Sequence, residues 1–126
     1  MDTKTILIVD DDADLTLANR LVLESAGYAV EEAADGATAL KKMRANKPDL
    51  VLMDVMMATP MDGYHTVQQM AHDNDLSGIP ILMISAVTAS EYAAQFPTTG
   101  PLPIRDFIAK PVAPEALLKK IQRCLR

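Results

Sequence analysis

Short apolar runs alternate with segments of helical periodicity along the whole chain, and no other feature restricts the fold as strongly. Strands are expected at residues 5–9, 28–33, 50–54, 79–85 and 104–109. Several of these runs are apolar almost throughout, which is typical of strands buried on both faces of a sheet. The alternation therefore predicts βαβ units that build a parallel sheet of five strands with helices on both faces.

The first and last helices show most clearly how the helical segments are recognised. The first is expected from about Asp14 to a stop at Gly27, with one face formed by Leu15, Ala18 and Val22. Pro114 and Glu115 suit the first turn of the last helix. Its apolar residues recur at helical spacing and are Leu117, Leu118, Ile121 and Leu125.

The segment after the fourth strand is less regular than the others. Residues 89–95 are compatible with two helical turns, but the helix cannot continue through Pro97, Gly100, Pro101 and Pro103. We therefore expect an irregular fourth helical region that ends in a loop over residues 96–103.

Length and charge restrict the organisation of the chain and its partners. With 126 residues the chain can form one core, so we expect a single domain over residues 1–126, without an output domain. The net charge of -5 argues against the basic surface that nucleic-acid binding requires. No apolar run is long enough to span a membrane, and the first residues are not a signal peptide. We expect a cytoplasmic protein that binds neither nucleic acid nor membrane.

Polar residues that could carry chemistry follow the buried strands. Asp10 and Asp11 come after the first strand, Asp54 ends the third, Ser85 ends the fourth and Lys110 follows the fifth. In open α/β sheets, ligands bind at the carboxyl ends of the strands. We therefore expect these five residues to meet at one site.

Three clustered carboxylates need a counter-charge. Two unit charges about 4 Å apart repel by roughly 4 kcal/mol at an effective dielectric constant near 20. A divalent cation together with Lys110 would balance the carboxylates of Asp10, Asp11 and Asp54. Mg²⁺ suits this set of oxygen ligands because it accepts few protein ligands and keeps waters that phosphate oxygens can replace. A cation, an ammonium and a hydroxyl around one carboxylate predict phosphoryl transfer to that carboxylate.

At these residues the sequence resembles the receiver domain of two-component response regulators. The resemblance covers the whole chain and rests on four motifs in order: ILIVDD, LVLMDVMM followed by DG, ILMISA and DFIAKP. It implies a flavodoxin-like, doubly wound sheet with strand order 2-1-3-4-5. It also implies a stand-alone signalling domain, not an enzyme in the usual sense, that accepts phosphate from a histidine kinase or a phosphotransfer protein.

The resemblance also implies a role for each residue that matches a motif. Asp54 would be the phosphoacceptor, and the metal ion, Mg²⁺ or Mn²⁺, would be held by Asp10, Asp11, Asp54 and the backbone carbonyl of Met56. Lys110 and Ser85 would bind the phosphoryl group, and Phe107 would be the aromatic switch residue. The peptide bond before Pro111 would be cis. Apolar Met56 and Val87 stand where the family tunes attack by water, which predicts slow self-dephosphorylation.

Two segments depart from the family pattern. The family usually has DxxMPxMDG after the acceptor strand, whereas this chain has DVMMATPMDG, so its loop over residues 57–62 is longer. FPTTGPLPIRDF replaces the usual Ala-rich helix and Gly-Ala turn before the last strand. This second segment is either a docking loop or a tolerated surface insertion, so the family's dimer interface is not transferred to this chain.

Two other functions remain open at this point. A binding module could keep the receiver fold without phosphorylation, although it would not need the complete set of acids, hydroxyl and lysine. A haloacid-dehalogenase-type phosphohydrolase would use Asp10 and Asp12 as a DxD motif, but Asp14 stands where that motif needs Thr or Val. The simpler interpretation of Asp12 and Asp14 is the start of a helix. His65 and His72 are expected to be exposed side chains.

Overall fold

The computed structural model describes residues 3–54, 62–85, 104–109 and 112–125. Its centre is a parallel sheet of five strands in the order β2-β1-β3-β4-β5. The strands are β1 (Thr5–Val9), β2 (Ala29–Ala33), β3 (Leu50–Asp54), β4 (Ile81–Ser85) and β5 (Ile104–Ala109). The expected flavodoxin-like order is thus confirmed, and β1, β3 and β5 have the predicted bounds.

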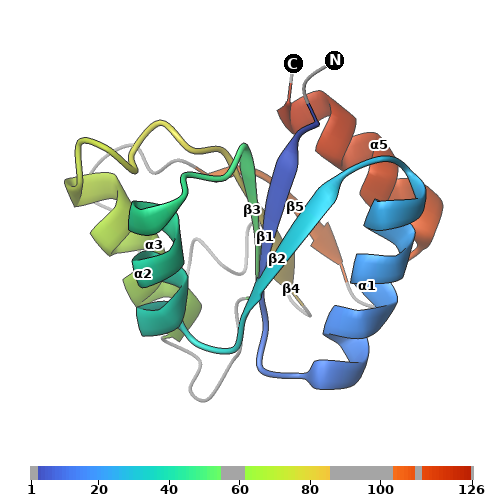
Figure 1. The fold of residues 1–126 in the computed structure, drawn as a ribbon, viewed down its shortest axis with the longest axis horizontal. Coiled ribbons are helices and arrows are strands. Elements are labelled where there is room, and N and C mark those ends of the chain that lie inside the picture. Colours follow the sequence, from blue (N-terminus) through green and yellow to red (C-terminus); the bar gives the residue numbers. More distant parts are fainter. Residues whose placement is uncertain (1–2, 55–61, 86–103, 110–111, 126) are drawn as a thin grey trace.

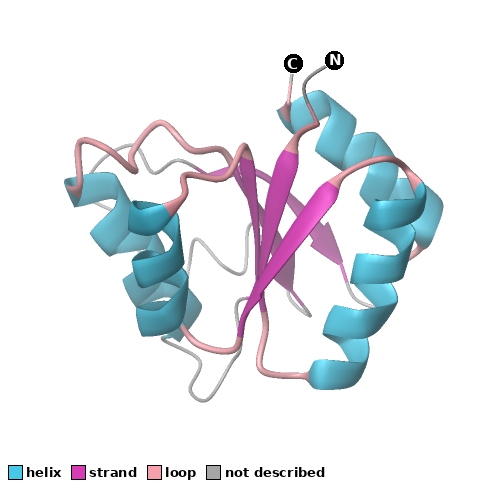
Figure 2. Cartoon of the chain, in the orientation of Figure 1, coloured by secondary structure: helices cyan, strands magenta, loops and turns pink. Residues whose placement is uncertain are grey.

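Four helices cover the sheet in the described part of the chain: α1 (Ala13–Ser25), α2 (Gly36–Ala45), α3 (Asp62–His72) and α5 (Pro114–Cys124). In Figure 1, α1 and α5 lie on one side of the sheet, and α2 and α3 on the other. Figure 2 shows the same three layers coloured by type of element. The irregular region expected after β4 falls in residues 86–103, which are outside the described residues.

Alternate residues of the central strands supply the cores on the two faces. Leu7 and Val9 of β1 belong to a core with α2 and α3, whereas Ile6 and Ile8 belong to a core with α1 and α5. Each of these four side chains is at most 1% exposed. Successive side chains of a strand point to opposite faces of the sheet, and both faces are buried here. The strands therefore appear in the sequence as continuous apolar runs rather than as alternating ones.

The end of α1 follows the expectation for Gly27. The N–H of Gly27 donates to the carbonyl of Glu24, and the N–H of Tyr28 donates to that of Leu23, the paired bonds of a Schellman motif. Gly27 has φ +96°, which L residues with a side chain rarely adopt. β2 can therefore start only two residues later, at Ala29.

The inward face of α1 differs from the expectation. The helix buries Thr16, Asn19 and Leu23. Of the residues assigned to one apolar face, Leu15 is 37% exposed, and Leu17 and Leu21 beside it are 56% and 60% exposed. The apolar face predicted from Leu15, Ala18 and Val22 is therefore not the buried one. Thr16 can be buried because its hydroxyl donates to the carbonyl of Asp12 at the start of the helix.

Among the described residues, no helix has both the length and the apolar character that a membrane span requires.

Candidate functional site

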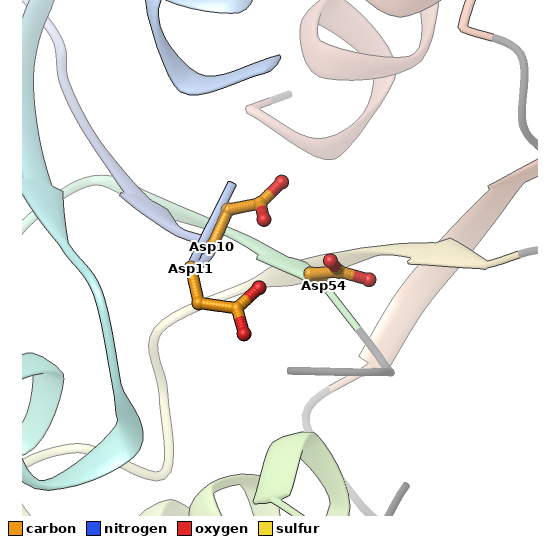
Figure 3. Close-up of side chains that lie close together, drawn as sticks. All are labelled: Asp10, Asp11 and Asp54. Carbon is orange, nitrogen blue, oxygen red and sulfur yellow. The ribbon is translucent and has the colours of Figure 1, made fainter. Parts of the chain in front are cut away.

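The sheet brings Asp10, Asp11 and Asp54 together. β1 and β3 are neighbouring parallel strands in which Val9 pairs with Met53, so Asp10, directly after β1, and Asp54, the last residue of β3, lie at the same edge of the sheet. One carboxylate oxygen from each aspartate lies within 4.8 Å of the others. Figure 3 shows the three side chains at the carboxyl ends of these strands, with their carboxylates gathered in one region. The structure thus places these predicted residues at one site.

The three carboxylates differ in their contact with solvent. Asp10 is 5% exposed and Asp54 is 3% exposed, whereas Asp11 is exposed. Buried carboxylates this close together repel strongly unless a cation or hydrogen-bond donors compensate their charge. The site therefore favours binding of a cation, which can enter from solvent on the side where Asp11 is exposed.

Backbone hydrogen bonds hold Asp10 in place. The N–H of Asp10 donates to the carbonyl of Ala33 on β2 at 3.0 Å. Its Oδ1 accepts the backbone N–H of Asp12 at 2.9 Å. β2 thus fixes the backbone of Asp10, and Asp12, the residue directly before α1, fixes its carboxylate.

The residues before α1 form a capped helix start. Asp12 Oδ1 accepts the backbone N–H groups of Asp14 at 3.0 Å and Leu15 at 3.1 Å. The carbonyl of Asp12 accepts the backbone N–H of Thr16 at 3.0 Å and its hydroxyl at 2.9 Å. The prediction that Asp12 starts a helix is confirmed. The contribution of Thr16 was missed, although a threonine four residues after an N-cap can be recognised in a sequence.

The oxygen donors fit Mg²⁺ by their chemistry. Mg²⁺ binds carboxylate oxygens at about 2.0–2.1 Å and keeps several waters. Three carboxylates spaced as here can hold one such ion, with direct contact from some and water-mediated contact from others. No histidine or cysteine joins this cluster among the described residues, so the donor set does not suit zinc.

The other predicted site residues are described only in part. Ser85 is the last residue of β4 and pairs with Ala109 of β5, at the same edge of the sheet as the aspartates. Phe107 is partly buried and packs against the core shared with α2 and α3. The remaining predicted residues lie outside the described residues: Met56, Val87, Lys110 and Pro111. The loop over residues 57–61 is also outside them.

A cavity of about 340 Å³ lies beside the aspartates. Asp10 and Asp11 form one wall, Thr16 contributes from α1, and Glu32 and Lys42 contribute from β2 and α2. The Lys42 ammonium donates to the backbone carbonyl of Glu32 and thereby links α2 to the edge strand. The cavity wall thus includes a lysine that is paired with a backbone carbonyl. His65 and His72 lie on α3 and are exposed, as expected.

Comparison with known proteins identifies the family. The model of the response regulator receiver domain matches residues 6–122, which is nearly the whole chain. The chain therefore belongs to the response regulator receiver domain family of two-component systems.

Sequence relatives include DNA-binding regulators. The chain is 35% identical over 128 residues to the DNA-binding response regulator MtrA of Mycobacterium tuberculosis, with 100% of this chain and 53% of MtrA covered. It is 31% identical over 121 residues to the DNA-binding dual master transcriptional regulator RpaA of Synechocystis, with 96% and 48% covered. The chain thus spans about half the length of these relatives.

Solved structures of similar proteins agree with the fold. The chemotaxis response regulator CheY4 of Vibrio cholerae has a TM-score of 0.83 and 32% identity, with 98% of this chain and 100% of CheY4 covered. The signal receiver domain of a signal transduction histidine kinase from Syntrophus aciditrophicus has a TM-score of 0.85 and 28% identity, with 98% and 90% covered. Receivers therefore share this architecture in different types of protein.

Proposed function

We propose that this chain is a phosphorylatable receiver that accepts a phosphoryl group on Asp54 in a reaction that depends on Mg²⁺ or Mn²⁺. The observation that carries the proposal is the placement of Asp54. It is buried at the end of β3, and its carboxylate lies within 4.8 Å of carboxylate oxygens of Asp10 and Asp11. Such a cluster has a nucleophile and a place for a cation, as phosphoryl transfer requires.

In the proposed reaction a histidine kinase or a phosphotransfer protein presents a phosphohistidine to the site. An Asp54 oxygen forms the new O–P bond while the N–P bond breaks, and the electron pair of that bond stays on the histidine nitrogen. When bound, the metal ion neutralises charge on the phosphoryl oxygens. Asp10, Asp11 and Asp54, with the carbonyl of Met56, would hold the ion, and Lys110 would pair with the phosphoryl group.

The signal is proposed to arise from the change of charge at Asp54. An aspartyl phosphate carries close to one additional negative charge compared with the carboxylate, which gives Ser85 and Lys110 a reason to move toward it. Phe107 would follow Ser85 and change the surface beside β4 and β5. The resemblance to receivers supports these roles, and the position of Ser85 and Phe107 on adjacent strands is compatible with them.

The surface of α1 supports a protein as the phosphodonor. Leu15, Leu17 and Leu21 are the large apolar side chains that are most exposed among the described residues. They lie on the helix that begins beside Asp10 and Asp11. An apolar surface next to the acceptor suits a protein that must hold its phosphohistidine over Asp54. The net charge of -5 supports contact of this chain with proteins rather than with nucleic acid. We also propose that the chain is located in the cytoplasm.

The phosphohydrolase alternative fits the geometry less well. It needs Asp10 as nucleophile and Asp12 as a catalytic acid or base. Asp12 Oδ1 already accepts two backbone N–H groups at the start of α1. The proposed activity of the chain is therefore limited to its own phosphorylation and dephosphorylation.

Mass spectrometry tests the proposal and separates the alternatives. After incubation with Mg²⁺ and acetyl phosphate, we expect one added phosphoryl group that is labile to hydroxylamine and absent in Asp54→Asn. Asp49→Asn is the matched control, because Asp49 lies at the opposite end of β3, where it accepts the N–H of Thr5 at 2.7 Å. No adduct with any donor would favour the binding module, and an adduct that persists in Asp54→Asn would favour the phosphohydrolase.

The same assay followed over time tests the persistence of the phosphoryl group. Apolar Met56 and Val87 are proposed to slow attack by water. A half-life of seconds that is unchanged in Met56→Asn and Val87→Glu would contradict this part of the proposal.

A further inference from the structure

We infer that Asp12 is a positioning residue for the metal site, and that it acts through Asp10 rather than by binding the ion itself. This inference rests on the proposed metal site. Asp12 is exposed and is not among the three carboxylates that lie within 4.8 Å of one another. We infer that its influence is transmitted through its hydrogen bonds, of which one reaches Asp10.

The first step is the bond from Asp12 to Asp10. The backbone N–H of Asp12 donates to Asp10 Oδ1 at 2.9 Å. This bond fixes the rotation of a carboxylate that is 5% exposed. It also uses part of the hydrogen-bonding capacity of Oδ1.

The second step is the bond network that fixes Asp12. Its side chain accepts two N–H groups from the first turn of α1, and its carbonyl accepts both the N–H and the hydroxyl of Thr16. Thr16 is only 5% exposed, so this anchor lies on the buried face of the helix. These bonds restrain the backbone at Asp12 and so help to keep its N–H directed at Asp10.

The third step is the consequence for metal binding. Residues that orient a metal ligand by hydrogen bonds influence affinity strongly, commonly by tenfold or more. Removal of the Asp12 side chain would leave its N–H in the chain but would release the turn that aims it. Binding of the ion would then have to order the carboxylate of Asp10, which would weaken the affinity.

The chain offers a matched control in the other aspartate that caps a helix. Asp35 Oδ1 accepts the N–H of Thr38 at the start of α2 at 2.7 Å, and Asp35 is not part of the carboxylate cluster. Asp12→Ala and Asp35→Ala remove the same kind of cap, and each is expected to lower the stability of the fold to a similar degree. Only the first should change the affinity for the ion.

The experiment is a titration of the folded protein with Mg²⁺, followed by backbone amide chemical shifts, well below the melting temperature of each variant. We expect Asp12→Ala to raise the Kd about tenfold. Asp12→Asn keeps a capping oxygen and is expected to stay within about twofold of the original chain. Asp35→Ala should also stay within about twofold, because it is a separate site.

Each outcome decides the inference. Equal Kd values for Asp12→Ala and Asp35→Ala would overturn it, because Asp12 would then be only a helix cap. Equal weakening in Asp12→Ala and Asp12→Asn would also overturn it, because the lost charge, rather than the lost cap, would explain the effect. If the original chain does not bind Mg²⁺, the proposed function fails together with the inference, whereas normal binding that is insensitive to Asp12 removes only the inference.

Discussion

The helices α1 and α5 pack on the same side of the sheet but bury different kinds of residue. α5 buries Leu117, Ile121 and Cys124, so its apolar stripe faces the core as its sequence predicts. α1 buries Thr16, Asn19 and Leu23 and leaves three leucines exposed. One helix therefore follows the hydrophobic pattern of its sequence, and the other does not.

The starts of the two helices differ as well. α5 begins at Pro114 after Ala113, which provides no side-chain cap, so burial of the apolar stripe decides how the helix is rotated. α1 begins at Ala13 after its N-cap Asp12, whose N–H donates to Asp10, so the start of this helix is tied to the acidic site. The start of α1 thus belongs to the acidic site, and the three leucines of this helix remain exposed.

The largest expected effect compares a leucine from each helix. Leu117 is fully buried, so Leu117→Ala should lower the free energy of unfolding by about 2–5 kcal/mol. Leu21 is 60% exposed, and Leu21→Ala should change this free energy by less than about 0.5 kcal/mol. Urea unfolding measures both. A loss above about 2 kcal/mol for Leu21→Ala would contradict the exposure of Leu21 in the structure.

A smaller effect is expected from the buried polar residue of α1. Asn19 is 8% exposed, and the described residues show no hydrogen-bond partner for its side chain. Asn19→Ala removes a buried amide and improves helix propensity, so it should raise the free energy of unfolding by about 1 kcal/mol. Leu23→Ala on the same face serves as the contrast, with an expected loss of about 2–5 kcal/mol. A loss of that size for Asn19→Ala would mean that the amide is a needed contact.

The smallest effect concerns the ion pairs that join the two helices to the edge strands. Arg20 of α1 pairs with Glu32 of β2, and Lys120 of α5 pairs with Asp106 of β5 at 3.1 Å. Partial burial raises the pKa of the Asp106 carboxyl, but the N–H of Phe107 and the Lys120 ammonium together outweigh it and hold the pKa below its usual value. Asp106 therefore stabilises the fold above its unfolded pKa of about 4, and this contribution is lost as the pH falls through the lower, folded pKa.

This sign predicts the pH dependence of a variant. Lys120→Met should lower the free energy of unfolding at pH 7 by no more than about 0.5 kcal/mol, because the Asp106 side chain is 37% exposed and solvent screens the pair. The difference from the original chain should shrink as Asp106 is protonated in acid. Denaturant unfolding at a series of pH values measures it, and a difference that grows toward low pH would contradict the assignment.

Much of the site could be predicted from the sequence because it depends on local features. Asp10, Asp11 and Asp54 follow apolar runs that are long enough to be buried strands, and parallel strands end at a common edge. The role of Asp12 was predicted only as a helix cap. Its bond to Asp10 depends on the turn that the chain takes after β1, and residue types alone do not specify that turn.

The sequence by itself determined the positions of the strands, the family of the chain and the three acidic residues of the site. Only the tertiary structure decided which face of α1 is buried and that the carboxylates of Asp10, Asp11 and Asp54 lie within 4.8 Å of one another. The physical reason is that strand identity depends on apolar residues that are neighbours in sequence. The rotation of a helix and the distance between two strand ends depend on contacts between segments that lie far apart in the chain, such as Asp10 with Ala33 and Val9 with Met53.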